Sequence, residues 1–189
     1  MKANKRKKKQ TRLKNGLIAG RFQPFHLGHL RLAIAAAETV DHLWIGITRP
    51  FGSSIPEIGG LRTSEKYNPL PYWLRFKCVE SALLRDALLP RDKFSILPLP
   101  LIPEIIGQLV PGGTVFLTNI VEAWSEQKEK IFIKAGLKVL RLDVGPKTIS
   151  STIIRQKIRM KDQGWKELVP KSIWREYAKD IGNYVCPEK

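Results

Sequence analysis

The stretch GRFQPFHLGHL, residues 20–30, joins a short apolar run to a segment rich in helix-forming residues. The run GLIAGR at 16–21 is too short and too uniformly apolar for a surface helix, so it predicts a buried strand. Residues 27–40 carry apolar side chains at intervals of three and four and therefore predict a helix. A buried strand that turns directly into a helix is the first half of a parallel βαβ unit.

The same alternation continues along the rest of the chain. Residues 49–71 are rich in Gly, Pro and Ser and predict a long loop, of a kind that is usually functional or mobile. Strands are predicted at 42–48, 94–102, 114–119 and 137–143, and helices at 72–89, 122–136, 150–161 and 171–181. The expected fold class is α/β, a Rossmann-like three-layer sandwich with a parallel sheet of about five strands and a small C-terminal helical segment. Ligands of such sheets bind beyond the carboxyl ends of the strands, at the switch point where the strand order reverses. We expect the ends of the first and fourth strands, residues 20–29 and 118–124, to meet at this point.

Charge is concentrated at the start of the 189-residue chain. Residues 1–14 hold eight lysines and arginines and no acid, which is half of the net charge of +16. We expect this segment to be a disordered basic tail, and residues 15–189 to form a single domain. The tail either tethers the protein to RNA, DNA or another anionic surface, or it only keeps the protein in solution.

The remaining composition predicts a cytoplasmic protein. The sequence shows no apolar stretch long enough to span a membrane and no secretory signal. Its two cysteines, Cys78 and Cys186, are far apart and lack the spacing of a metal site, so we expect reduced thiols.

His26 and His29 are the first candidates for function. Zinc sites on a helix favour a spacing of four residues and a carboxylate nearby, whereas residues 15–37 contain no acid. Two histidines that only pack are the second alternative. The third is anion recognition, because a helix N-terminus attracts phosphate and Gly28 leaves its backbone open to one. Arg21 adds a fork of donors at the end of the strand.

A second candidate group, ISSTIIR, occupies residues 149–155. Ser150, Ser151 and Thr152 are suited to the start of a helix, where they either cap it or present hydroxyl and N–H groups to an anion. Arg155 lies one turn further and is expected to reach the same end. The alternative is an ordinary capped helix with a surface arginine.

These two motifs resemble those of the nucleotidylyltransferase superfamily, [H/T]-x-G-H and I-S-S-T-x-x-R. Within the superfamily, GRFQPFHLGH resembles the opening of the archaeal-type nicotinamide-nucleotide adenylyltransferases. The stretches YNPLPYWLR, LTNIV and WKELVPKSI resemble further segments of that family, so the likeness covers most of residues 16–180.

The resemblance implies transfer of AMP from ATP to nicotinamide mononucleotide, which gives NAD and pyrophosphate. His26, His29 and Arg155 would be the catalytic residues. The expected ATP-binding residues are Gly20, Arg21, Phe22, Gln23, Gly28, Arg75, Ser150, Ser151 and Thr152, and those near the acceptor are Thr118, Asn119 and Trp124. Mg²⁺ is expected on the substrate phosphates, with no metal held by the protein itself.

The chain departs from the family where the acceptor is bound. Pro71 and Leu74 stand where the family has Thr and Glu, and PLPLIPEII replaces a P-x-P-D segment. Another acceptor, such as nicotinate mononucleotide, therefore stays open, as does a non-enzymatic nucleotide- or RNA-binding protein that uses the tail. Trp124 either stacks on a pyridine ring or packs its helix. We expect no membrane partner and only weak nucleic-acid contact through the tail; a homo-oligomer is left open.

Overall fold

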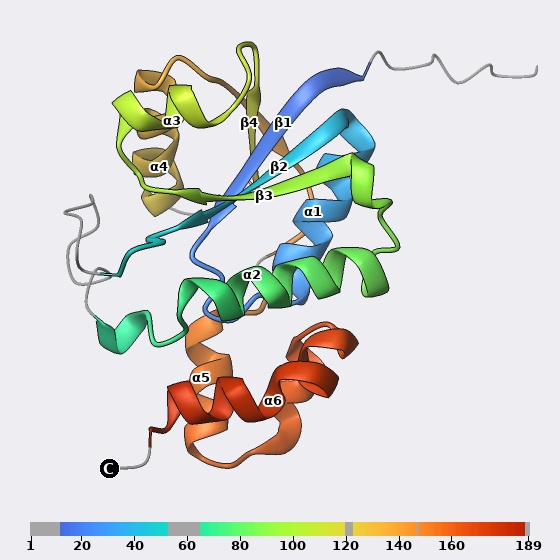
Figure 1. Cartoon of the computed structure of the whole chain (residues 1–189), viewed down its shortest axis with the longest axis vertical. Helices are drawn as coiled ribbons and strands as arrows, with labels where there is room; N and C mark the ends of the chain where they lie inside the picture. The colour runs from blue at the N-terminus through green and yellow to red at the C-terminus, as the bar shows by residue number, and fades with distance from the viewer. Residues whose placement is uncertain (1–11, 53–64, 120–122, 147, 188–189) are drawn as a thin grey trace, which may run out of the picture.

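Five parallel strands form the centre of the fold, in the order β3-β2-β1-β4-β5 (Figure 1). The computed structural model describes residues 12–52, 65–119, 123–146 and 148–187. The strands are β1 (Leu13–Gly20), β2 (Val40–Thr48), β3 (Phe94–Leu99), β4 (Val115–Asn119) and β5 (Lys138–Leu142). The chain order reverses between β1 and β4, so these two neighbours mark the switch point that the sequence predicts.

Helices cover both faces of this sheet. Side chains alternate along β1, so that Ile18 belongs to one hydrophobic cluster and Leu17 to the other. The Ile18 cluster includes residues of α1 (Leu27–Thr39) and α2 (Tyr72–Ser81), and the Leu17 cluster includes residues of α3 (Pro103–Leu109) and α4 (Ala123–Lys134). The predicted three-layer α/β sandwich is confirmed.

The C-terminal segment adds α5 (Ser151–Arg159), a 3₁₀ turn (Gln163–Leu168) and α6 (Lys171–Val185). These elements lie beyond α2 (Figure 1) and extend the core on its side of the sheet, through Ile154, Trp165 and Ile173. The predicted C-terminal helical segment is therefore part of the same core.

Several boundaries differ from the prediction. β1 begins at Leu13, so the last two residues of the expected tail belong to the sheet; residues 1–11 lie outside the described residues. β3 ends at Leu99, and the proline-rich stretch behind it forms α3, a helix that the sequence pattern did not predict. Pro103 takes the first position of that helix, where its missing N–H leaves no hydrogen bond unmade. The helix predicted over 72–89 is α-helical to Ser81 and continues as a π-helical turn over Ala82–Asp86.

The two central strands separate before they end. β1 and β4 pair only at Gly16 with Val115 and at Leu17 with Phe116, although β1 continues to Gly20 and β4 to Asn119. β1 stays paired with β2 up to Gly20. The unpaired ends of β1 and β4 thus define a split, called below the β1–β4 split, at the carboxyl edge of the sheet.

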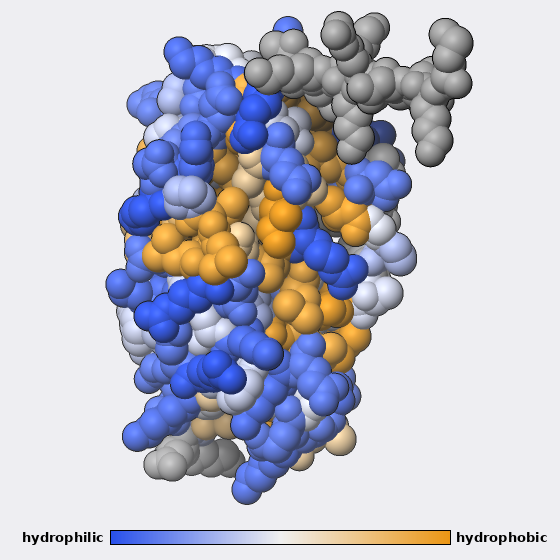
Figure 2. All heavy atoms as spheres, turned by 90° about the vertical axis from the view of Figure 1, so that its right-hand side faces the viewer, coloured by the Kyte–Doolittle hydropathy of each residue, from blue (hydrophilic) through white to orange (hydrophobic). Residues whose placement is uncertain are grey.

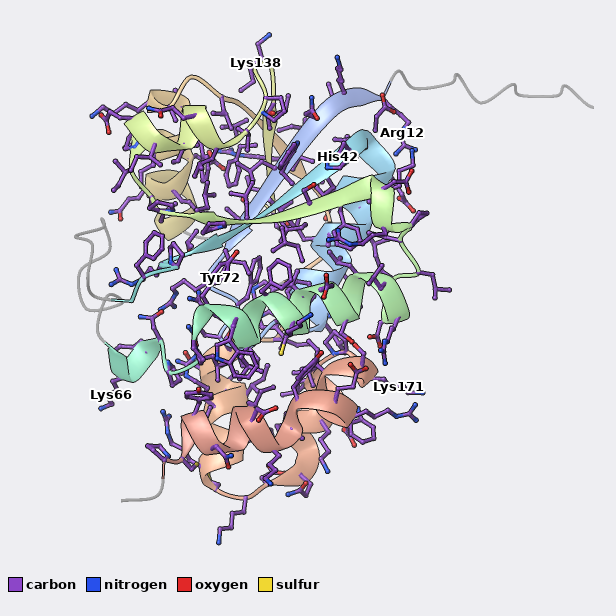
Figure 3. The ribbon with its side chains drawn as sticks, viewed as in Figure 1. Arg12, His42, Lys66, Tyr72, Lys138 and Lys171 are labelled. Carbon is purple, nitrogen blue, oxygen red and sulfur yellow. The ribbon has the colours of Figure 1, made fainter. Side chains whose placement is uncertain are left out.

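The opposite edge of the sheet holds the start of the described chain. Arg12 donates hydrogen bonds to the carbonyls of Ala37 and Val40 and lies 3.4 Å from a carboxylate oxygen of Asp41. Figure 3 shows Arg12 and His42 at this end, far from Tyr72 at the start of α2.

The side of the molecule seen in Figure 2 is mostly hydrophilic, with a hydrophobic area at its middle.

Candidate functional site

His26 and His29 lie at the N-terminus of α1, with their rings stacked. His26 is the residue that precedes the helix, and His29 stands in its first turn. The ring centroids are 3.6 Å apart and the planes differ by 19°. Phe22 and Phe25 contact the His29 ring at centroid distances of 4.9 and 5.4 Å. The two imidazoles are therefore held in fixed orientations by aromatic neighbours.

A hydrogen bond from the backbone indicates which ring nitrogen of His29 carries the proton. The backbone N–H of His26 donates to Nδ1 of His29 over 3.3 Å. A nitrogen that accepts a hydrogen bond carries no proton, so the neutral ring has its proton on Nε2. His29 thus offers an Nε2–H donor without the need to become charged.

Gly28 and Gly20 leave room for the rings of this site. A Cβ on Gly28 would lie 3.2 Å from Nδ1 and Cε1 of His26, which is tighter than ordinary contact. A Cβ on Gly20 would lie 2.5 Å from the ring of Phe22, which has a left-handed backbone at φ 52°. We expected Gly28 to leave space for phosphate; the structure adds that it leaves space for the His26 ring.

The first turn of α5 docks on the loop between β1 and α1. The Ser151 hydroxyl donates to the carbonyl of Pro24 over 3.1 Å, and Nη1 of Arg155 donates to the carbonyl of Gln23 over 2.7 Å. The structure thus brings together the two motifs that lie 120 residues apart in the sequence. Neither α1 nor α5 has an acidic residue in its first turn, so the positive ends of both helices stay uncompensated by such side chains.

Arg155 is a buried cation, not a surface arginine. It is 2% exposed, and its Nη2 lies 3.5 Å from the Thr152 hydroxyl. Its Nε is buried and has no hydrogen-bond partner among the described residues. Burial, and then the positive charges of Arg21 and Arg159, lower the pKa of Arg155 to about 10, so it remains charged at neutral pH.

Ser150 caps α5, because its hydroxyl accepts from the backbone N–H of Ile153 over 3.3 Å. With the bond from Ser151 to Pro24 and the contact of Arg155 with Thr152, all three predicted hydroxyls have partners within the protein. Phosphate binding by Ser150, Ser151 and Thr152 stays a prediction.

Gln23 and Arg75 connect the loops around the site. The Gln23 side-chain amide forms two hydrogen bonds with the backbone of Leu70. Its Nε2 donates to the Leu70 carbonyl over 3.1 Å, and its Oε1 accepts from the Leu70 N–H over 2.8 Å. Arg75 is 3% exposed and donates to the carbonyls of Arg21, Thr48 and Arg49 at 2.8–3.0 Å. It therefore ties the carboxyl end of β1 to that of β2, a role that the sequence did not indicate. Direct contacts of Gln23 and Arg75 with ATP stay predictions.

The residues predicted near the acceptor follow β4. Thr118 is buried, and the Asn119 amide donates to the carbonyl of Gly145 over 3.3 Å, which joins β4 to the loop after β5. Trp124 lies in the first turn of α4, but its side chain is outside the described part of the chain, as are residues 120–122. Its two expected roles stay open.

Lys128 is a site residue that sequence analysis missed. Its ammonium group donates to the carbonyl of Ala19, next to the β1–β4 split, and lies 5.3 Å from the centre of the Phe116 ring. Burial, with a further contribution from Arg21, lowers the pKa of Lys128 to about 8. One signal existed: Lys128 shares the apolar face of α4 with Ile131 and Phe132, at the helical spacings of three and four.

The described residues include no group of three or more His, Cys, Asp or Glu side chains that could hold a metal ion. In the same part of the chain, no helix is both long and apolar enough to cross a membrane. Arg75, Lys128 and Arg155 lie at the carboxyl edge of the sheet with the N-termini of α1 and α5. Groups of this kind are suited to phosphate.

Known proteins resemble this chain over most of its length. The model of the cytidylyltransferase-like family matches residues 17–157. A phosphonoformate cytidylyltransferase of Streptomyces viridochromogenes is 32% identical over 167 residues, which cover 85% of this chain and 88% of the relative. A nicotinamide-nucleotide adenylyltransferase of Saccharolobus solfataricus is 32% identical over 86% of this chain and 89% of its own length. That of Pyrococcus furiosus is 29% identical over 89% of this chain and 85% of its own length.

A solved structure shows the same fold. It is a bifunctional NMN adenylyltransferase/ADP ribose pyrophosphatase of Francisella tularensis, in complex with AMP and a manganese ion. The TM-score is 0.69 at 20% sequence identity, and the match covers 92% of this chain and 50% of that protein. This chain thus corresponds to half of the bifunctional protein.

Proposed function

Because this chain belongs to the cytidylyltransferase-like family, we propose that it transfers the adenylyl group of ATP to the phosphate of nicotinamide mononucleotide, which gives NAD and pyrophosphate. The observation that carries the proposal is that Arg155 bonds the same loop, between β1 and α1, that leads into the stacked His26–His29 pair. The archaeal nicotinamide-nucleotide adenylyltransferases, at up to 32% identity over most of both chains, support the choice of substrates.

The reaction is an in-line displacement at the α-phosphorus of ATP. An oxygen of the acceptor phosphate forms a bond to this phosphorus, and the bond to the oxygen that bridges the α- and β-phosphates breaks, so its electron pair leaves with pyrophosphate. The protein needs no nucleophile of its own for this step; it positions the phosphates and neutralises charge.

His29 and Arg155 supply the charge stabilisation. The Nε2–H of neutral His29 donates to the α-phosphate or to the bridging oxygen, on which negative charge grows as the bond breaks. Arg155, anchored on Gln23, holds the β- and γ-phosphates beside the N-termini of α1 and α5. These donors are held in place before the substrate arrives, so little reorganisation is needed.

A divalent metal, Mg²⁺ in our proposal, would enter with the phosphates of ATP. The donors of this site are nitrogens of cationic or N–H groups and not carboxylates, so the phosphates themselves would supply the oxygen ligands. Bound in this way, the metal neutralises part of the triphosphate charge. We place the reaction in the cytoplasm, where the free thiols Cys78 and Cys186 would stay reduced.

A second candidate is cytidylyl transfer to a phosphonate. The phosphonoformate cytidylyltransferase, 32% identical over 85% of this chain, favours it. The departures at Pro71 and Leu74, before and within α2, also favour an altered acceptor site.

Pyrophosphate release measured over a matrix of substrates distinguishes these candidates. The donors are ATP and CTP, the acceptors are nicotinamide mononucleotide, nicotinate mononucleotide and phosphonoformate, and each pair is measured with Mg²⁺, with Mn²⁺ and with EDTA. We expect the highest kcat/KM for ATP with nicotinamide mononucleotide, and no release with EDTA. A higher kcat/KM for CTP with phosphonoformate would replace the first proposal by the second.

A further inference from the structure

Three cations lie along one short piece of backbone at the carboxyl edge of the sheet. Lys128 donates to the carbonyl of Ala19, and Arg155 donates to the carbonyl of Gln23 over 2.7 Å. Arg21 stands midway between these two anchor points in the chain. Its Nη1 donates to Oδ1 of Asn68 over 3.3 Å, and its charge acts on both Lys128 and Arg155. We call Lys128, Arg21 and Arg155 the cation row.

The cation row crosses the edge of the sheet from one layer to the other. Lys128 comes from α4, which packs on the Leu17 side, whereas Arg155 comes from α5, which packs on the Ile18 side. The anchor residues Ala19 and Gln23 are four positions apart, and an extended chain spans at most about 3.5 Å per position, so the anchors are no more than about 14 Å apart. The two anchored cations are therefore close enough to contact phosphate groups of one reacting complex.

The row carries charge that the described protein leaves uncompensated at both ends. Neither Lys128 nor Arg155 forms a salt bridge with any carboxylate in the described part of the chain. Burial and the charge of Arg21 lower the pKa of both groups, which agrees with a position of Arg21 close to each. Cations of like sign, one buried and one half-buried, are unfavourable in the empty protein and favourable once an anion binds them.

The chemistry assigns one anion to each end. An in-line displacement requires that the attacking and leaving oxygens lie on opposite sides of the α-phosphorus. The leaving pyrophosphate belongs at the Arg155 end, where the N-termini of α1 and α5 and the histidine pair lie. The attacking group must therefore approach from the other end of the row, where the β1–β4 split and Lys128 lie.

We propose that Lys128, with Arg21, binds the phosphate or phosphonate group of the acceptor on the α4 side of the β1–β4 split. This inference rests on the proposed nucleotidyl transfer and defines the class of its second substrate. The acceptor carries a doubly charged phosphate or phosphonate as its attacking group. Substrates that would attack through a neutral hydroxyl are excluded.

Three substitutions of Lys128 and one matched control test the assignment. Lys128→Met removes both the charge and the hydrogen bond to Ala19, Lys128→Gln keeps a donor for that carbonyl without the charge, and Lys128→Arg keeps the charge. Lys130→Met removes an exposed lysine of the same helix. Circular dichroism and thermal melting establish that each variant is folded.

The measurement is the KM of each substrate in the pyrophosphate assay, with whichever acceptor of the matrix the wild type uses. We expect Lys128→Met and Lys128→Gln to raise the KM of the acceptor on the order of tenfold to a hundredfold, as for loss of a charge-assisted hydrogen bond. The KM of ATP should change less than twofold, and Lys128→Arg and Lys130→Met should stay close to wild type. An unchanged acceptor KM in folded Lys128→Gln, or an equal rise for both substrates, overturns the assignment.

A binding experiment tests the subsite apart from turnover. The protein is saturated with α,β-methylene ATP, which cannot transfer AMP, and inorganic phosphate is titrated into it by calorimetry. Wild type and Lys130→Met should bind phosphate at least tenfold more tightly than Lys128→Gln. Equal affinities would refute the role of Lys128 even if adenylyl transfer occurs. Absence of turnover with every acceptor, with the affinity difference intact, would instead refute the proposed function alone.

Discussion

The stacked imidazoles at the start of α1 show how single residues make this site. Local sequence was sufficient to place His26, Gly28 and His29 at the start of a helix, because a strand, a turn and a helix N-terminus follow one another within a dozen residues. Sequence could not show that Arg75 and Gln23 bond backbone carbonyls and N–H groups of other segments, because those partners become neighbours only in the fold. The place of Lys128 on the apolar face of α4 was a signal in the sequence, but its partner, the carbonyl of Ala19, becomes a neighbour only in the fold.

His29 is the residue whose loss should affect the chemical step most. Without the Nε2–H donor, the transition state loses one preorganised hydrogen bond, so we expect His29→Ala to lower kcat on the order of 100-fold or more. His42→Ala, which removes the histidine bonded to Ser95 near the far edge of the sheet, should retain the wild-type kcat. Steady-state rates and thermal melting measure both. Near-normal transfer by folded His29→Ala would refute the catalytic role.

Arg155 should matter for both ATP binding and stability. Its removal deletes a buried charge-assisted hydrogen bond to Gln23, which is worth roughly 1.5–3 kcal/mol. We therefore expect Arg155→Ala to lower the melting temperature by roughly 5 °C and to raise the KM of ATP. Arg159→Ala changes an exposed arginine of the same helix and serves as the control. An unchanged KM of ATP in Arg155→Ala would argue against phosphate binding.

The lowered pKa of Lys128, about 8 in place of 10.5, predicts a pH dependence. As pH rises from 7 to 9 the lysine loses its proton, whereas a phosphate monoester stays doubly charged, because its second pKa is about 6. We expect the KM of the acceptor to rise several-fold over this range in wild type and to stay flat in Lys128→Arg. Above pH 8 the unfolded chain still binds the proton that the native lysine has released, so this group makes the native state more stable as pH rises towards 10.5.

At the scale of elements, the strands and most helices followed from periodicity, and the exceptions have physical causes. The PLPLIPEII stretch contains three prolines, which predict a turn, yet Pro103 is compatible with the first turn of α3. β1 reaches back to Leu13 because Arg12 bonds the carbonyls at the end of α1 and the start of β2, contacts that composition does not reveal. The switch point between β1 and β4 was predicted correctly, since it depends only on strand order.

Two glycine-to-alanine substitutions should have different effects, one on activity at the start of α1 and one on the stability of α6. In Gly28→Ala the new methyl group must displace the His26 ring by a few tenths of an ångström, so activity should fall about tenfold although alanine favours the helix. In Gly182→Ala nothing lies within 4 Å of the new Cβ, so α6 should gain about 0.5–1 kcal/mol with activity unchanged. Urea unfolding and pyrophosphate release check both. Full activity in Gly28→Ala would show that the ring stack tolerates the methyl group.

At the scale of the whole molecule, the boundary of the basic tail can be tested by two truncations. Removal of residues 1–11 leaves β1 and Arg12 intact, so transfer and melting temperature should stay at wild-type values. Removal of residues 1–14 also deletes Leu13 and Lys14 from the sheet and should lower the melting temperature by several degrees. RNA binding that falls with salt in the full chain and is absent after removal of 1–11 would assign it to the tail. Loss of transfer in the shorter truncation would contradict an accessory role.

The direction of β1 has a consequence for how the protein can be attached to something else. Seven steps of about 3.3 Å each place Leu13 roughly 23 Å from Gly20, so the amino-terminal end of the strand and the cation row lie at opposite edges of the sheet. A bead, a surface or a nucleic acid that holds the chain by its first residues would leave the carboxyl edge of the sheet facing away from the support. Substrates would then reach an anchored molecule as freely as a diffusing one, so immobilisation through the amino terminus should preserve turnover.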